Sequence, residues 1–184
     1  FAGPGFEKGF LVSSGTEATE AALKLMRLNG TKQGKKRNGV ICLDGNWHGR
    51  TMGAQLMSSS LEQKEWIGND DPNIHHIPFP YPWVLGEKSP EAFLQEGLKH
   101  LERKQIDLAE DVCGFMLETF QGWGAVFYPE EFVQAIEKVC IEKNILLVFD
   151  EMQAGFARTG KKFGYEHYGV KADMIVCGKG MSSG

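Results

Sequence analysis

The sequence is poor in the features that mark specialised protein classes. Its four cysteines in 184 residues form no Cys-x-x-Cys pair and lie in apolar segments, which favours a reduced, intracellular (cytoplasmic) setting over a disulfide framework. No apolar run approaches the ~20 residues that a membrane span needs. Lys and Arg number 20 against 24 Asp and Glu, so no basic excess exists to follow a nucleic-acid backbone. We therefore expect neither a membrane nor a nucleic acid as partner.

The usual nucleotide-binding loops are also missing. A phosphate-binding P-loop ending at Lys179 would need glycine at position 173 and serine or threonine at position 180, where the chain has Asp173 and Gly180. No Gly-x-Gly-x-x-Gly sequence follows a predicted strand either, so dinucleotide binding lacks its usual loop.

What the sequence does contain is an alternation of short apolar runs and longer amphipathic segments. The runs are apolar throughout, which is typical of parallel strands that are covered on both faces. The predicted strands are 10–12, 40–43, 113–117, 145–149 and 174–177. Helix-spaced apolar residues predict helices from Ala18 to a stop at Asn29-Gly30, from Ser89 to about Leu101, and over 132–140 after Pro129. The predicted fold class is α/β, a mostly parallel sheet with helices on both faces, and 60–86 reads as a long irregular excursion.

Polar residues follow every predicted strand. They are Ser13–Thr16, Asp44–Arg50, Glu118, Asp150–Glu151 and Gly178–Gly180. In an open parallel sheet, ligands bind at the carboxyl ends of the strands. The sequence therefore predicts one site that combines a phosphate-type loop, an aromatic ring, carboxylates and a lysine.

The first of these segments permits two interpretations. Ser14-Gly-Thr-Glu17 is a capping box, so it can simply begin a helix. It can also bind an anion, because Gly15 allows close approach and a helix start offers hydroxyls and free amides.

Lys179 and Asp150 are open to the same choice. Lys179 is either a surface residue in a turn or, between two glycines at a strand end, a Schiff-base amine. Asp150 ends an apolar run, so its carboxylate needs a partner. That partner is either a structural cation such as Arg158 or a protonated pyridine nitrogen.

Five segments together resemble one family. They are Phe10–Lys24, Trp47–Thr51, Glu118–Gly122, Phe149–Gly160 and Ala172–Gly180. Over essentially the whole chain, and in the same order, they resemble class III (ω-amino acid type) aminotransferases, which use pyridoxal 5'-phosphate (PLP) on the fold type I scaffold. The resemblance implies that 1–184 is the central part of one PLP-binding large domain, with an N-terminal segment and a small C-terminal domain outside it.

The resemblance also implies residue roles. It makes Lys179 the Schiff-base lysine and proton shuttle, and Asp150 the partner of the pyridine nitrogen. It implies no metal ligand. The cofactor-binding residues that it implies are Ser14, Gly15 and Thr16 at the phosphate, Trp47 stacked on the ring, Glu118 near the site, Gln153 near the phenolic oxygen, and Asp150 and Lys179 themselves.

The chain departs from the family pattern after Glu118. Thr119 replaces a proline, and Trp123 replaces a glutamate that in several members pairs with a substrate-gating arginine. An indole cannot form that ion pair. Glu151 and Arg158 belong to the resembling segments but are interpreted as structural.

The function implied is transfer of an amino group from an amine or amino acid to a 2-oxo acid by a ping-pong path, in a full-length homodimer. The alternatives are another PLP reaction on the same scaffold (aminomutase, racemase or decarboxylase) and a non-catalytic truncated homologue that serves as a binding module.

Three further features carry less information. His75-His76 lacks spaced metal-ligand partners and is interpreted as part of a loop or strand. His48 is placed beside the site without a role. The aromatic residues Phe79, Tyr81 and Trp83 either line a pocket or pack a loop.

Overall fold

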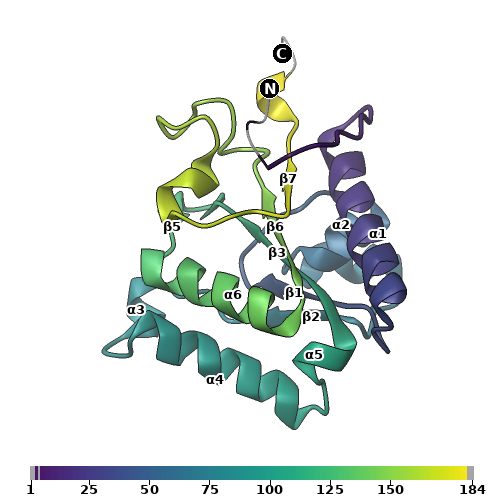
Figure 1. Ribbon diagram of the computed structural model, residues 1–184, viewed down its shortest axis with the longest axis vertical. Helices are drawn as coiled ribbons and strands as arrows, with labels where there is room; N and C mark the ends of the chain where they lie inside the picture. The colour runs from purple at the N-terminus through teal and green to yellow at the C-terminus, as the bar shows by residue number, and fades with distance from the viewer. Residues whose placement is uncertain (1–2, 4, 182–184) are drawn as a thin grey trace.

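A computed structural model describes residue 3 and residues 5–181 of the chain. Five strands form one parallel sheet in the order β2-β1-β3-β6-β7 (Figure 1). They are β1 (Gly39–Leu43), β2 (Ile74–Ile77), β3 (Val112–Glu118), β6 (Leu146–Asp150) and β7 (Met174–Val176). The predicted α/β class is confirmed, and four of the five predicted strands are present with ends shifted by a residue or so.

The strand predicted at 10–12 is wrong. This segment has no regular secondary structure and pairs with no strand in the described part of the chain, and Phe10 and Leu11 are 73% and 87% exposed. An apolar run becomes a strand only when a neighbour accepts its backbone hydrogen bonds, and here none does.

The sheet instead gains β2, which lies within the stretch predicted to be irregular. His75 and Ile77 of β2 are buried while Ile74 and His76 are half-buried, so the strand alternates between two environments. Histidines at its centre masked the apolar signal on which the strand predictions rested. Of the two interpretations left open for His75-His76, loop or strand, the structure supports the strand.

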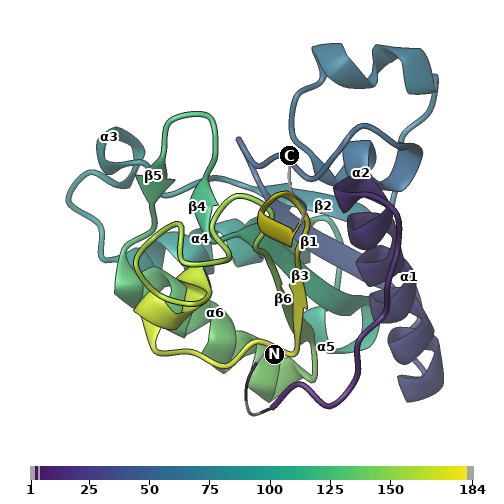
Figure 2. The same cartoon turned by 90° about the horizontal axis from the view of Figure 1, so that it is seen from above.

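Helices cover both faces of the sheet (Figures 1 and 2). Helices α1 (Gly15–Gln33) and α2 (Met52–Met57) lie on one face, and α4 (Pro90–Arg103) and α6 (Glu130–Lys143) lie on the other. Alternate residues of each strand supply the two cores: Val40 and Cys42 of β1 pack with α1, whereas Ile41 and Leu43 join the core under α4 and α6. This arrangement leaves the carboxyl edge of the sheet free to form a site.

The helix end predicted at Asn29-Gly30 is also wrong. Helix α1 continues to Gln33 and ends at Gly34, which adopts the left-handed conformation (φ 78°). Gly30 is buried inside the helix, where a Cβ atom would lie 2.5 Å from Cβ of Cys113. This glycine therefore permits close packing of α1 on β3 and does not stop the helix.

The remaining elements are short, and local propensity did not predict them. They are the 3-10 helices η1 (Glu62–Ile67), η2 (Gly164–Tyr168) and η3 (Lys179–Met181), the helices α3 (Pro82–Leu85) and α5 (Leu108–Asp111), and the antiparallel pair β4 (Phe120–Gln121) and β5 (Val126–Phe127).

Two predictions about absences can be compared with the structure. All four cysteines are free, and Cys42, Cys113 and Cys140 are buried, so no disulfide framework is present. Within the described residues, no helix has the length and apolar character needed to cross a membrane.

Candidate active site

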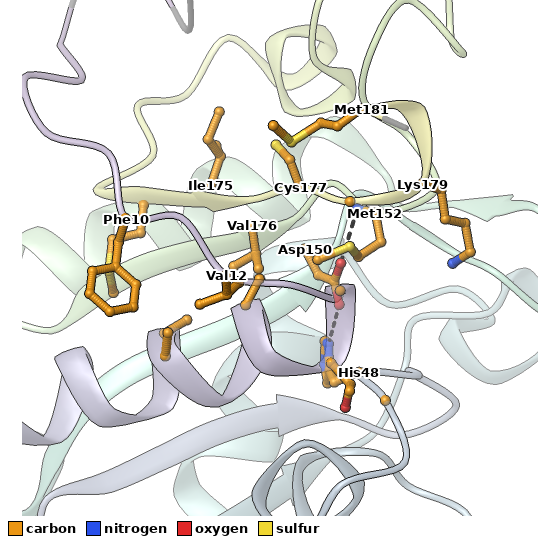
Figure 3. A pocket seen from close by; sticks show the side chains of 18 of the residues that line it. Phe10, Val12, His48, Asp150, Met152, Ile175, Val176, Cys177, Lys179 and Met181 are labelled. Atoms are coloured by element: carbon orange, nitrogen blue, oxygen red, sulfur yellow. Dashed lines mark hydrogen bonds and ion pairs between the residues drawn. The ribbon is translucent and has the colours of Figure 1, made fainter. Parts of the chain in front are cut away.

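A cavity of about 1770 Å³ lies at the carboxyl edge of the sheet. Because the strands run parallel, their carboxyl ends meet there with the start of α1 and the loop after β1. All eight residues predicted for the site line this cavity: Ser14, Gly15, Thr16, Trp47, Glu118, Asp150, Gln153 and Lys179. Figure 3 shows part of the lining, with Asp150, His48 and Lys179 around the same pocket.

The loop before α1 forms a capped helix start. Ser14 caps the helix: its Oγ accepts the backbone N–H of Glu17 at 3.4 Å, and the Glu17 carboxylate accepts the N–H of Ser13 at 2.8 Å. The capping interpretation is therefore correct in outline, with Ser13 as the reciprocal partner. Helix α1 has 19 residues, so its amino end also offers free N–H groups and a positive dipole end to an anion.

Two glycines bring this loop against the lysine-bearing loop. A Cβ on Gly15 would lie 2.8 Å from Sδ of Met152, and a Cβ on Gly178 would lie 2.5 Å from the same sulfur and 3.3 Å from Cα of Gly15. A side chain at either position would displace the Met152 thioether, and one at Gly178 would also crowd the backbone of Gly15. The glycines thus allow the start of α1 to lie close to the segment that carries Lys179.

Asp150 has a partner that the sequence reasoning did not assign. Its Oδ2 lies 2.9 Å from Nδ1 of His48, and its Oδ1 accepts the N–H of Met152 at 3.0 Å, as the dashed lines in Figure 3 show. Asp150 and His48 are both buried, whereas Arg158 is exposed and no ion pair joins it to Asp150. The structural partner is therefore His48 and not Arg158. Only the need of a buried carboxylate for a donor could have pointed to this histidine.

His48 keeps one unsatisfied atom. Its Nε2 is buried and has no hydrogen-bond partner. Its backbone N–H donates to Oγ of Ser58 at 2.8 Å, and its carbonyl accepts Oγ1 of Thr19 at 2.7 Å. The ring is therefore fixed by its backbone and by Asp150.

Glu118 ends β3 next to Asp150 in the sheet register. It is buried, and burial raises the pKa of its carboxyl to about 7, helped by the charge of Asp150 and opposed by His48 and two backbone N–H donors. The donors are the N–H groups of Trp47 at 3.0 Å and Gly122 at 3.5 Å.

The remaining predicted residues are more open to the cavity. Trp47 is half-buried and meets Trp123 edge to face, with ring centroids 5.9 Å apart, while the Arg50 guanidinium carbon lies 5.0 Å from the centre of the Trp47 ring. Gln153 and Lys179 are both exposed. Lys179 begins η3 directly after the loop that leaves β7.

Glu151 serves the fold, since it is absent from the cavity lining. Its buried carboxylate accepts the N–H groups of Gly164 at 2.8 Å and Tyr165 at 2.7 Å and the hydroxyl of Thr119. The threonine that departs from the family pattern thus supplies a hydrogen bond that proline could not.

The other candidates lie outside the cavity. No group of three or more metal-ligating side chains occurs among the described residues, and His76 bonds the carbonyl of Met57 at 3.0 Å. Tyr81 stacks on Trp83 with ring centroids 4.7 Å apart and meets Phe79 at a tilt with centroids 4.4 Å apart, and none of the three lines the cavity. Packing is therefore the interpretation that the structure favours for these rings.

Comparison with known proteins gives consistent matches. The family model described as "Aminotransferase class-III" matches residues 2–184. Acetylornithine aminotransferase of Caldanaerobacter subterraneus is 35% identical over 179 residues, which cover 96% of this chain and 41% of that protein. Alanine/serine racemase of Pyrococcus horikoshii is 34% identical over 181 residues, covering 93% and 37%.

A solved structure agrees with these sequence matches. It is an amine transaminase from an uncultivated Pseudomonas species in the PLP-bound form, with a TM-score of 0.79 and 28% identity over 92% of this chain and 39% of that one. The chain thus spans about two fifths of the length of the proteins that it matches.

Proposed function

This chain belongs to the class III aminotransferase family, and from that premise we propose that the complete protein moves an amino group from an amine or amino acid to a 2-oxo acid. Its cofactor would be PLP, and the active form a homodimer. The chain would be the central part of the PLP-binding large domain, with an N-terminal segment and a small C-terminal domain outside it. The observation that carries the proposal is that the eight predicted residues line one cavity at the carboxyl edge.

The cavity fits the cofactor's phosphate. The free N–H groups at the start of α1 and the hydroxyls of Ser14 and Thr16 suit a phosphate, and the Gly15–Gly178 approach leaves no Cβ to obstruct it. Thr16 is itself held in place, since its Oγ1 lies 2.8 Å from that of Thr51. These residues would bind and orient the group.

The cavity also fits a pyridine ring. Asp150, fixed by His48 and by the N–H of Met152, would hold a proton at the ring nitrogen. Trp47 would stack on the ring, and Gln153 would lie at its phenolic oxygen. When bound, PLP supplies an electron sink for negative charge that develops at the amine-bearing carbon.

Lys179 would move the proton. An amine at the start of η3, just beyond the end of β7, can take a proton from the donor carbon and return it at a neighbouring position. Apolar lining such as Phe10, Val12 and Ile175 would exclude water from that transfer.

Racemisation is the second candidate, favoured by the similarity to the alanine/serine racemase. The residues assigned to the cofactor serve both reactions, so the product decides between them. A racemase would invert the donor's configuration without forming a new amino acid from the acceptor.

The experiment uses the complete protein loaded with PLP, a panel of amines and amino acids, and a 2-oxo acid acceptor. We expect release of the donor's carbonyl product with equimolar formation of the acceptor's amino acid, and loss of both in Lys179→Ala. The control is Lys8→Ala, which removes another lysine that lines the cavity. Inversion of the donor alone would contradict aminotransfer, and no turnover of any donor would favour the non-catalytic homologue.

A further inference from the structure

Glu118 lies between the two loops that carry the indoles of the site, the half-buried Trp47 and the exposed Trp123. Trp47 follows β1, and Trp123 follows β3 in the turn between β4 and β5. Oε2 of Glu118 accepts the Trp47 N–H at 3.0 Å and the Gly122 N–H at 3.5 Å, the second at the long limit of a hydrogen bond. One carboxylate oxygen thus bridges the backbones of two loops that are not joined by a strand pair.

Apart from the Arg50 guanidinium over Trp47, few contacts hold the two indoles in place. They meet edge to face at an interplanar angle of 85°, yet Trp123 is 66% exposed. A ring that buries so little surface gains little fixed orientation from apolar packing. Its position must therefore come from the backbone of the residue before it, which is Gly122.

At Gly122 a side chain would crowd the carboxylate of Glu118. A Cβ there would lie 2.9 Å from Oε1 of Glu118 and 2.5 Å from Oε1 of Gln153. The glycine lets the turn approach the carboxylate closely enough for its N–H to point at Oε2. Glu118, its two donors and the glycine act as one unit.

We propose that Glu118 is a positioning residue, whose carboxylate holds the Trp47–Trp123 pair in its edge-to-face arrangement. That the pair would position a cofactor ring rests on the proposed function. The edge-to-face arrangement of the two indoles does not depend on it. Glu118 therefore acts through Trp47.

The charged and titratable groups around Glu118 indicate the pH range in which its hold on the two loops weakens. His48 and Asp150 face it from the neighbouring strand ends, and the hydroxyls of Tyr81 and Tyr128 couple to it electrostatically. Because burial raises the pKa of Glu118 to about 7, the carboxylate is protonated over the neutral range as pH falls. Its hydrogen bonds then lose their charge assistance.

The test follows each indole separately in the complete protein without cofactor. Tryptophans are replaced by 5-fluorotryptophan, and the fluorine NMR resonances of Trp47, Trp66 and Trp123 are assigned by single Trp→Phe substitutions. Trp66 is the internal control, because it lies on η1 and donates its Nε1–H to Gln55 at 3.0 Å, away from the site.

In Glu118→Ala we expect the Trp47 and Trp123 resonances to shift together while that of Trp66 stays in place. In Glu118→Gln, whose carbonyl can still accept both N–H groups but carries no charge, we expect the positions that the wild-type resonances take when Glu118 is protonated. Unmoved Trp47 and Trp123 resonances in a folded Glu118→Ala variant would overturn the proposal, as would an equal shift in Glu118→Gln.

A pH titration of the wild-type protein decides the matter if Glu118→Ala does not fold. We expect the Trp47 and Trp123 resonances to titrate with one shared midpoint near neutrality, and this transition to be lost in Glu118→Gln. Separate midpoints, or an unchanged transition in Glu118→Gln, would overturn the proposal. Both measurements are independent of PLP binding, so failure of the positioning role of Glu118 and failure of the proposed function are distinguishable.

Discussion

The faces of the sheet bury apolar side chains, whereas its carboxyl edge buries polar and charged ones. Each face is a continuous apolar core, such as the one in which α6 buries Phe132 and Ile136 completely. The edge instead buries Asp150, Glu118 and His48, and the ring of His48 has an atom without a partner.

This difference indicates that the faces stabilise the fold and that the edge forms the site. Apolar burial on the faces stabilises the fold by about 25 cal/mol for each Å² removed from water. Buried polar groups at the edge cost free energy unless they are fully paired, so the edge is held by the fold that the faces stabilise. Variants of the faces should therefore act chiefly on stability, and variants of the edge chiefly on binding and rate, with the titration of Glu118 as the exception taken up below.

The largest expected effect belongs to the faces. Phe132→Ala removes a fully buried ring that packs near Phe93 and Tyr128, so we expect a loss of about 3–5 kcal/mol in the free energy of unfolding. Chemical denaturation of the complete protein measures it. The matched control is Ile141→Ala on the same helix, at a side chain that is 75% exposed. A folded Phe132→Ala protein that binds PLP much more weakly would contradict the proposal that the faces determine stability and the edge determines binding.

The next effect belongs to the edge. Asp150→Asn keeps the shape of the side chain but loses the charge that would hold a proton on the ring, so we expect the rate of transamination to fall at least ~100-fold. PLP binding and unfolding should change little. Asp44→Asn, at an exposed carboxylate that follows β1 outside the cavity, is the control and should keep its rate. Near-normal turnover in Asp150→Asn would count against the assigned role.

A smaller effect should appear in the pH dependence of stability. The pKa of Glu118 is raised from 4.5 to about 7 in the folded protein. The stability that its protonated form contributes to the fold is therefore present at low pH and is lost as pH rises through 7. Glu118→Gln should remove this contribution, on the order of 2 kcal/mol between pH 4.5 and 7.

The free energy of unfolding must be compared between the wild-type protein and Glu118→Gln at each pH, because another group changes stability in the opposite sense. Burial lowers the pKa of His76 from 6.5 to about 4, which makes stability rise with pH over a similar range in both. Identical curves of unfolding free energy against pH would show that Glu118 does not titrate there.

The smallest effect is expected away from both regions. Lys88 and Glu96 form a 2.6 Å ion pair on an exposed surface, and Lys88→Gln should change the free energy of unfolding by less than about 0.5 kcal/mol. Thermal unfolding at two salt concentrations checks this, since the small contribution should vanish at high salt. A larger loss would mean that stability is not concentrated in the faces.

The sequence predicted the edge better than the details of the sheet. Residues that follow apolar runs were grouped correctly, because parallel strands necessarily bring their carboxyl ends together. The same apolar criterion failed at 10–12, where pairing depends on a neighbour, and at β2, where histidines interrupt the pattern.

The contact between Asp150 and His48 shows what a linear pattern leaves open. The two residues are 102 positions apart, and β3 separates their strands in the sheet. Their pairing depends on how the loop after β1 folds back over the sheet edge. Gly30 gives a similar lesson, because its packing against Cys113 can be recognised only once α1 lies on β3.

The central claim is that the carboxyl edge is a PLP site with Lys179 as its reactive amine. Borohydride reduction of the complete protein with bound PLP, followed by peptide mapping, tests it most directly. We expect a pyridoxyl group on Lys179, in the peptide that contains Cys177. A pyridoxyl group on another lysine, including Lys8 in the same cavity, would contradict it.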